Sequence, residues 1–311
     1  MRLVWLTHSD CLAHETPAGH PEQVARLAAV HDALSGEAFE AVERVEALEA
    51  SDAHILRAHP RAHLDAVSHA APRDGIVQLD PDTWMSPGSL RAARLSAGAG
   101  VQAVDMVLGG AADRAFVATR PPGHHAERQT PMGFCLFGNI AIAAKHALDA
   151  HGLERVAIVD FDVHHGNGTQ DLLWDDERVL FISTHQVPLY PGTGAAEERG
   201  AHGNVLNIPL PPESDGAFAR DLYSRRVIPA LDAFAPQLVL ISAGFDAHAR
   251  DPLAQLYWEE EDYVWLTREI CAVATRHAGG RVVSMLEGGY DLPALAASVA
   301  AHVGAMKGDA G

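Results

Sequence analysis

Four short stretches of the sequence combine glycine or proline with side chains that can bind a metal ion or transfer a proton. They are Pro121-Pro122-Gly123-His124-His125, Asp160-Phe161-Asp162-Val163-His164-His165-Gly166-Asn167, Ser242-Ala243-Gly244-Phe245-Asp246 and Glu287-Gly288-Gly289-Tyr290. Imidazole and carboxylate groups bind catalytic metal ions, and they also transfer protons during hydrolysis. The four stretches together predict a metal-dependent hydrolytic site.

Asp162, His164 and Asp246 are the candidate metal ligands. Asp162 and His164 lie two residues apart at the end of a predicted strand, so their side chains point to the same side. Two carboxylates and one imidazole, with a position left open for water, are typical of catalytic zinc rather than of a closed structural site. The same ligands would also suit manganese or iron(II), so ligand type alone leaves the metal open.

The remaining groups of the four stretches could move protons and stabilise charge. His124 and His125 follow a stiff Pro-Pro-Gly turn, and one of them could accept a proton from a water activated by the metal. Such a histidine needs a partner on its second ring nitrogen, for which Asp160 and Asn167 are the candidates. Tyr290 could donate a hydrogen bond to the developing oxyanion, opposite the metal.

Eight other histidines and the three cysteines are not candidates for the site. Eight histidines fall in predicted helices and receive no role: His31, His54, His59, His69, His146, His151, His277 and His302. The three cysteines are too widely spaced for a disulfide framework or a thiolate zinc site, and we expect them to be small buried hydrophobes in a reducing compartment.

Strands and helices alternate along the chain. Seven apolar, β-branched runs predict strands covered on both faces: Leu3–Leu6, Ala115–Ala118, Val156–Val159, Val179–Ile182, Val205–Ile208, Leu238–Ile241 and Val282–Leu286. Helices are predicted at Glu22–Leu34, from the N-cap Ser86 to Gly109, and at Asn139–His151, Ser214–Phe234 and Glu259–His277. The alternation predicts an open α/β fold with a mostly parallel sheet, as a single domain over residues 1–311. Ligands bind beyond the carboxyl ends of such strands, where the four stretches would meet.

The composition restricts the class of protein. Hydrophobic residues make up 48% and charged residues 21%, which allows a sizeable core and excludes wholesale disorder. The net charge of −18, with 23 basic against 41 acidic residues, argues against binding to nucleic acid. The N-terminal apolar run is too short for a signal peptide and no stretch is long enough to span a membrane, so we expect a cytoplasmic protein without a membrane partner.

The motifs resemble one known family. RPPGHHAE, GFCLFGN, DFDVHHGNGTQ, SAGFDAH and EGGY occur in the order and spacing of the histone deacetylase superfamily, and the similarity extends from HPEQVAR at His20 to the last helix. DFDVHHGNGTQ with EGGY resembles the class II branch and its bacterial relatives, the histone-deacetylase-like amidohydrolases. The resemblance implies an arginase/deacetylase-type fold, an open, mostly parallel eight-stranded sheet flanked by helices.

The resemblance also implies which residues hold ions. Asp162, His164 and Asp246 would bind one catalytic zinc ion. Relatives often hold a potassium ion beneath the zinc on oxygens that correspond here to Asp160, Asp162, His164, Ser183 and Thr184.

The catalytic roles follow from the same resemblance. His124 and His125 would form the electrostatic and general acid/base pair, with His125 as the base, and Tyr290 would polarise the scissile carbonyl. Asp160 would orient His124, and Asn167 would orient His125.

The resemblance fixes the reaction class better than the substrate. Phe134 would form one wall of an acyl-lysine tunnel and Tyr190, where relatives usually have phenylalanine, the other, while Asp82 would hold the substrate. Polyamine-selective relatives carry glutamate seven residues after the last zinc ligand, where this chain has Leu253. This favours N6-acetyl-lysine in proteins or peptides over an acetylated polyamine. An arginase-like manganese hydrolase and a non-catalytic acyl-lysine binding module are the alternatives, and acyl-chain length and oligomeric state stay open.

Overall fold

Eight parallel strands form the central sheet of the molecule, which is a computed structural model that describes residues 1–308. From edge to edge the strands are β2 (Glu43–Glu46), β1 (Leu3–Thr7), β5 (Arg114–Val117), β10 (Val282–Leu286), β9 (Leu238–Ala243), β6 (Val156–Asp160), β7 (Val179–Gln186) and β8 (Val205–Leu210). Every neighbouring pair is parallel, which confirms the predicted sheet. The last three residues of the predicted domain, 309–311, lie outside the described residues.

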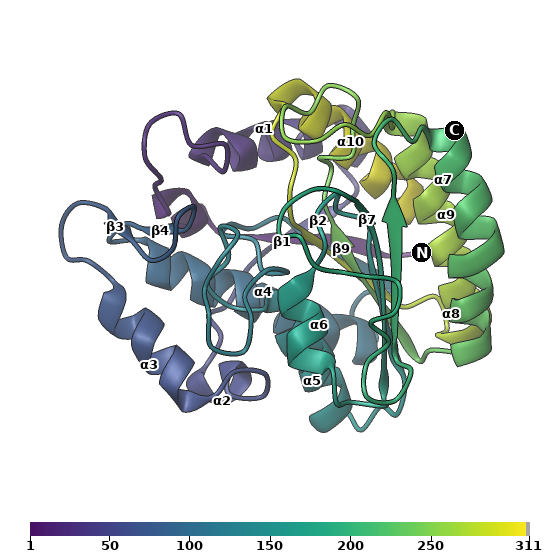
Figure 1. The fold of residues 1–311 in the computed structure, drawn as a ribbon, viewed down its shortest axis with the longest axis horizontal. Coiled ribbons are helices and arrows are strands. Elements are labelled where there is room, and N and C mark those ends of the chain that lie inside the picture. Colours follow the sequence, from purple (N-terminus) through teal and green to yellow (C-terminus); the bar gives the residue numbers. More distant parts are fainter. Residues whose placement is uncertain (309–311) are drawn as a thin grey trace.

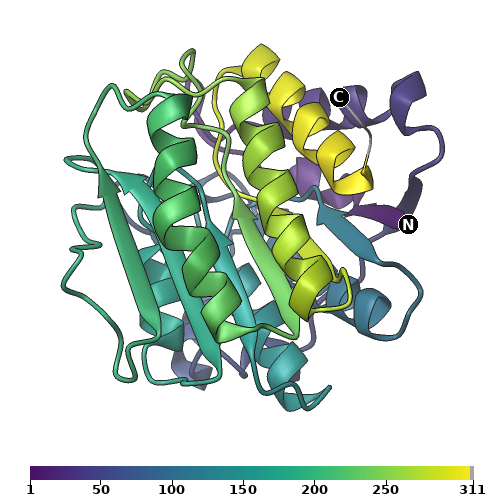
Figure 2. The ribbon, with the colours of Figure 1, turned by 90° about the vertical axis from the view of Figure 1, so that its right-hand side faces the viewer.

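Helices cover both faces of the sheet. Figure 1 shows α7 (Gly216–Leu222), α8 (Ile228–Phe234) and α9 (Glu260–His277) on one side and α4 (Ser89–Leu108), α5 (Asn139–Asp149) and α6 (Asn167–Leu173) on the other. Figure 2 shows α9 and α10 (Leu292–Lys307) lying across the near face of the sheet, and α1 (Val24–Leu34) packs against α10. The smaller elements are α2 (Asp52–Ile55), α3 (Arg61–Ala70) and the hairpin of β3 (Val77–Gln78) with β4 (Trp84–Met85). None of the described helices is both long and apolar enough to cross a membrane.

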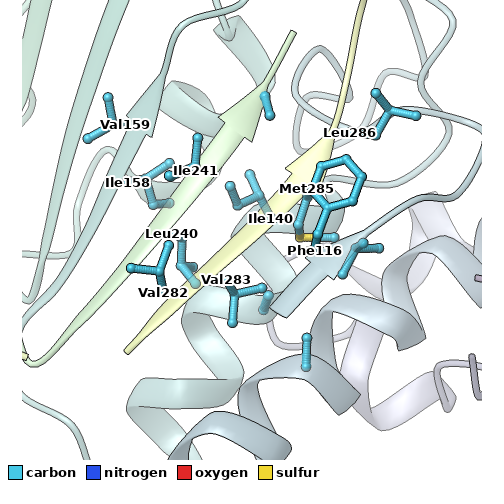
Figure 3. Packing of buried hydrophobic residues seen from close by; sticks show 14 of the residues in the cluster. Phe116, Ile140, Ile158, Val159, Leu240, Ile241, Val282, Val283, Met285 and Leu286 are labelled. Atoms are coloured by element: carbon cyan, nitrogen blue, oxygen red, sulfur yellow. The ribbon is translucent and has the colours of Figure 1, made fainter. Parts of the chain in front are cut away.

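The central strands are mostly apolar because both of their faces are buried. Every residue of β5, β6, β9 and β10 is buried. Figure 3 shows side chains of these strands, among them Phe116, Leu240 and Met285, packed together with Ile140 of α5. The resulting core holds the four strand ends that carry the predicted site in fixed positions.

The structure differs from the sequence-based expectations at an edge and at one helix start. Strand β2 has the largely exposed sequence Glu-Arg-Val-Glu, so no apolar run marked this edge strand. The helix predicted from Ser86 begins at Ser89 instead. The Ser86 hydroxyl donates to the Ala13 carbonyl at 2.9 Å and accepts the Glu15 N–H at 2.9 Å, so it binds the N-terminal loop and does not cap the helix.

Candidate active site

The four chemically active stretches converge at the carboxyl ends of adjacent strands. Strands β5, β10, β9 and β6 are consecutive in the sheet, although they are not consecutive in the sequence. Each of the four loops therefore leaves the same edge of the sheet beside the next one. The crevice predicted from the sequence is formed by elements that lie more than 160 residues apart in the chain, as in the hydrogen bond between Gly123 and Glu287.

Asp162, His164 and Asp246 form a buried cluster whose donor atoms face one another. His164 Nδ1 lies 3.1 Å from Asp162 Oδ1 and 3.1 Å from Asp246 Oδ2. All three side chains are buried, and one ligand atom from each lies within 4.8 Å of the other two. Two carboxylate oxygens and one imidazole nitrogen at this spacing are a donor set that zinc accepts.

The charge of this cluster also suits a cation. Burial alone would lower the pKa of His164, but hydrogen bonds to Asp162 and Asp246 raise it to about 10. The imidazole thus acquires a positive charge between two buried carboxylates. A divalent ion bound to the same atoms would neutralise the carboxylates and leave the imidazole as a neutral ligand.

The carboxylates are held in place by glycines and backbone amides. A Cβ at Gly244 would lie 2.0 Å from Asp162 Oδ2, and a Cβ at Gly288 would lie 2.0 Å from Asp246 Oδ2. The Gly288 N–H donates to Asp162 Oδ2 at 2.8 Å, and the Val163 N–H donates to Asp246 Oδ1 at 2.9 Å. Only glycine permits this close approach, and the amides fix the oxygens that would not face the ion.

His124 and His125 lie beside the cluster, each with a hydrogen-bond partner on Nδ1. His124 Nδ1 lies 3.0 Å from Asp160 Oδ2, and His125 Nδ1 lies 2.7 Å from Asn167 Oδ1. The Asn167 amide group donates to Glu127 Oε1 at 2.8 Å, so its oxygen faces His125. His125 therefore carries its proton on Nδ1, which leaves a lone pair on Nε2.

The two neighbouring rings are held in different charge states. Burial would lower the pKa of His124, but the charges of Asp162 and Asp160 raise it well above its ordinary value. Burial, together with the positive charges of His124 and His164, holds the pKa of His125 well below its ordinary value. His124 is thus the charged member of the pair and His125 the neutral one, ready to accept a proton.

A cavity of about 230 Å³ leads to these groups. It is lined by Asp82, His125, Gly133, Phe134, His164, Leu189, Tyr190, Leu253 and Tyr290. The Tyr190 ring meets the His125 ring edge to face at 5.1 Å between centroids, and the Phe134 ring meets the Tyr290 ring in the same way at 5.9 Å. The four residues predicted from the sequence to line a tunnel all lie on this cavity.

Tyr290 is held on the wall of the cavity by contacts on two sides. Its backbone N–H donates to Asp251 Oδ2 at 2.7 Å, and the Arg26 guanidinium lies 4.9 Å from the centre of its ring. Burial raises the pKa of the Tyr290 hydroxyl well above its ordinary value. The hydroxyl therefore stays protonated and can donate a hydrogen bond.

The residues proposed for potassium lie on the neighbouring strands β6 and β7 and on the loop that follows β6. Asp160 of β6 is the register partner of Ser183 of β7, and Thr184 follows Ser183. The Thr184 hydroxyl is hydrogen bonded to the Tyr223 hydroxyl at 2.8 Å. The potassium site stays a prediction.

Glu287 is a buried residue of the site whose role the motifs do not predict. Its Oε2 accepts the N–H of Gly123 at 2.7 Å and the N–H of His124 at 3.2 Å. Burial raises its pKa to about 7. Glu287 binds the backbone of the His-His turn and does not contact a reacting group. The one sign of its role in the sequence is a charged residue directly after an apolar strand. Asp251 is a similar case, because it accepts the N–H of Tyr290 and, at 3.0 Å, that of Leu253.

Comparisons with known proteins show which family the chain resembles. The family model of the histone deacetylase domain matches residues 20–306. The histone deacetylase-like amidohydrolase of Pseudomonas aeruginosa is 43% identical over 280 residues, which cover 88% of this chain and 73% of the relative. A probable deacetylase of Archaeoglobus fulgidus is 40% identical over 291 residues, which cover 92% and 80% of the two chains.

A solved structure shares the same fold over nearly the whole chain. The crystal structure of the HDA15 HD domain superposes with a TM-score of 0.94 at 34% sequence identity, over 99% of this chain and 89% of that one. Its fold is the arginase/deacetylase type. The chain described here belongs to the histone deacetylase family.

Proposed function

We propose that the chain is a zinc-dependent deacylase that hydrolyses N6-acetyl-lysine in proteins or peptides. The family supports a deacetylase acting on an acylated substrate. The observation that carries the finer proposal is the buried set Asp162, His164 and Asp246, which lies beside His125 at the cavity that Tyr290 and Phe134 line. A metal site, a base and an oxyanion donor thus meet beside a narrow apolar passage.

Zinc bound to Asp162, His164 and Asp246 would supply a Lewis acid for the carbonyl and an activated water as nucleophile. His125, neutral and with its Nε2 lone pair free, would take the proton from that water and later donate it to the leaving amine. His124 would stabilise the negative charge that develops, and the Tyr290 hydroxyl would donate to the carbonyl oxygen of the substrate.

The cavity suits a long apolar side chain that ends in an amide. Phe134 and Tyr190 offer aromatic surfaces that would pack against the methylene groups of an acylated lysine. Leu253 lies on the same cavity and offers no charge to a second amine. Asp82 also lines the cavity, where its carboxylate could accept a backbone N–H of a peptide.

An acetylated polyamine is the second candidate substrate. The net charge of −18 and the position of Asp82 would attract a cationic amine. Leu253 argues against it, because it leaves that amine without a partner at the position where glutamate would serve. The binding-module alternative is weaker still, since no ligand, base or oxyanion donor is missing. A cytoplasmic location stays a prediction.

The test is turnover by the zinc-loaded protein on acetyl-lysine peptide, longer acyl-lysine peptides, acetylputrescine and acetylspermidine. We expect the acetyl-lysine peptide to have the highest kcat/KM. Removal of the metal with a chelator should abolish turnover, and zinc should restore it. Preference for the polyamines would overturn the substrate, and full turnover after chelation would overturn the metal mechanism.

A further inference from the structure

A second cluster of histidine and aspartate lies far from the cavity, between α4 and α5. Asp105 is in the last turn of α4, His146 is in the last turn of α5, and His151 follows α5. His146 Nε2 lies 2.7 Å and His151 Nε2 lies 2.6 Å from the same oxygen, Asp105 Oδ1. Helices α4 and α5 run into β5 and β6, so the cluster lies near the amino ends of these strands, opposite the active site.

The hydrogen bonds around these rings leave their ε nitrogens able to bind a cation. His146 Nδ1 is buried without a hydrogen-bond partner, and His151 Nδ1 has no partner among residues 1–308. Neither ring is therefore forced to keep its proton on Nε2. When the proton moves to Nδ1 or leaves, Nε2 presents a lone pair beside the Asp105 carboxylate.

A superficially similar cluster shows the opposite arrangement. His248 Nε2 lies 3.5 Å from Glu259 and 3.5 Å from Glu260. Its Nδ1, however, accepts the Arg250 N–H at 3.1 Å, which keeps the ring proton on Nε2. That nitrogen carries the ring proton and has no hydrogen-bond partner among residues 1–308, so it offers no lone pair to a metal ion. The same test excludes His54, beside His146, because its Nδ1 accepts the Ser51 N–H at 3.3 Å.

The electrostatic surroundings of the first cluster also favour a cation. Asp105 and His146 both lie at helix C-termini, where the exposed carbonyl groups attract positive charge. The Asp105 side chain is 52% exposed, so its carboxylate is open to solvent and available as a ligand.

We propose that Asp105, His146 and His151 bind a divalent transition-metal ion such as zinc, which links the ends of α4 and α5. Two imidazoles and a carboxylate are ligands that zinc prefers, and solvent would complete the coordination. The donor atoms must separate to about 3.3 Å, the spacing set by zinc–ligand distances in a tetrahedral site. Asp105 can make this adjustment because its side chain is 52% exposed.

The test is a calorimetric titration of Zn²⁺ into the full chain that already holds one equivalent of zinc. The wild-type protein should bind a second equivalent, and its Tm should rise with zinc. His151→Ala and Asp105→Asn should each weaken this second binding by at least about tenfold, the lower end of what even an outer partner contributes to metal affinity. Both variants should keep the turnover of the wild-type protein.

His69→Ala is the matched control, since it removes an exposed imidazole of α3 outside both clusters. It should keep the second equivalent. Binding of one equivalent only would overturn the proposal. A second equivalent that survives both His151→Ala and Asp105→Asn, or that His69→Ala weakens as much, would also overturn it. Unchanged thermal melts of the zinc-free variants would show that any loss is not a loss of folding.

Discussion

The two histidine–aspartate clusters use the same side chains in opposite settings. Asp162, His164 and Asp246 lie buried at strand ends, whereas Asp105 and His151 lie partly exposed at helix ends. In the buried cluster, glycines pack against both carboxylates, and each carboxylate accepts a hydrogen bond from a backbone amide. Within residues 1–308, the carboxylate of the exposed cluster is hydrogen bonded only to the two imidazoles that would share the ion with it.

The difference shows that ligand type does not decide what a cluster does. The buried cluster has a neutral base, His125, and a protonated donor, Tyr290, on the same cavity. Among the residues that the structure describes, no such base or donor lies beside the exposed cluster, so an ion there could link two helices without catalysing a reaction. Chemistry comes from the groups that converge on the open position of the ion.

The largest expected effect is a loss of turnover when the Tyr290 hydroxyl is removed. Tyr290→Phe should lower kcat by at least about a hundredfold, the scale of a lost oxyanion donor, while zinc affinity at Asp162, His164 and Asp246 is unchanged. Steady-state kinetics on the acetyl-lysine peptide measure it. Tyr257→Phe, which changes an exposed tyrosine, is the control. Near-normal turnover of the Tyr290 variant would remove this residue from the mechanism.

A second variant tests whether the buried cluster, unlike the exposed one, depends on carboxylates that are held rigidly in place. Gly244→Ala places a methyl group against the Asp162 carboxylate, so we expect a loss of about 1–3 kcal/mol in the free energy of unfolding, as for other overpacked sites. Zinc affinity at the buried cluster should fall by about tenfold, as for a displaced outer partner. Urea unfolding and competition with a chelating dye measure the two.

Gly304→Ala in α10 is the matched control for that substitution. A Cβ there would meet nothing within 4 Å. Because alanine favours the helix over glycine, this variant should be more stable by about 0.5–1 kcal/mol. Equal behaviour of the two alanine variants would mean that the buried carboxylates tolerate displacement as readily as a free helix surface.

A smaller effect is expected at Glu287, which holds the His-His turn through its backbone. Glu287→Ala leaves two buried N–H groups without an acceptor, and we expect kcat to fall about tenfold, within the range of a displaced catalytic group, at nearly constant KM. Glu287→Gln retains an acceptor oxygen and should restore most of the turnover. A Gln variant as slow as the Ala variant would show that the charge, and not the position, matters.

A separate effect on stability, outside both clusters, concerns how a buried ring responds to pH. Burial lowers the pKa of His302 to about 3, and its unfolded value is about 6.5. The folded state therefore excludes a proton, so its contribution to stability is complete above pH 6.5 and is lost as the pH falls towards 3. The expected slope is about 1.4 kcal/mol per pH unit for each such histidine.

His302→Gln should make the free energy of unfolding less dependent on pH, by about 1.4 kcal/mol per pH unit, the contribution of one titrating group. Urea unfolding between pH 6.5 and 4 measures this change. Ser298→Ala, a non-titrating change one turn earlier in the same buried part of α10, should leave the slope unchanged. An unchanged slope in the His302 variant would show that this ring binds its proton equally in the folded and unfolded chains.

Much of the fold could be predicted because the central strands are buried on both faces. Runs such as Val282–Leu286 are apolar except for one serine, and their alternation with helices predicts the parallel sheet. The edge strand Glu43–Glu46 escaped prediction because exposed strands carry no such signal. The predicted start of α4 at Ser86 was wrong, because the Ser86 hydroxyl binds a loop that is distant in the sequence.

In the candidate site, too, residues within local motifs could be predicted, and residues that act through distant partners could not. Residues that would act through their side chains, such as Asp162 and His125, stand in recognisable motifs at strand ends. Glu287 acts on backbone amides more than 160 residues away, and no local pattern reveals that. His146 and His151 received no role because their partner Asp105 lies on another helix, 41 and 46 residues away.

The order of the strands has a consequence for synthesis of the chain. Of the strands in residues 1–308, β10 comes last in the sequence, yet it lies in the middle of the sheet, between β5 and β9. Until it inserts, both neighbours expose open edges, and Tyr290 and Gly288 are absent from the crevice. We therefore expect a nascent chain to acquire its deacylase site all at once, after the ribosome has delivered β10, and any truncation before β10 to yield an aggregation-prone and inactive protein.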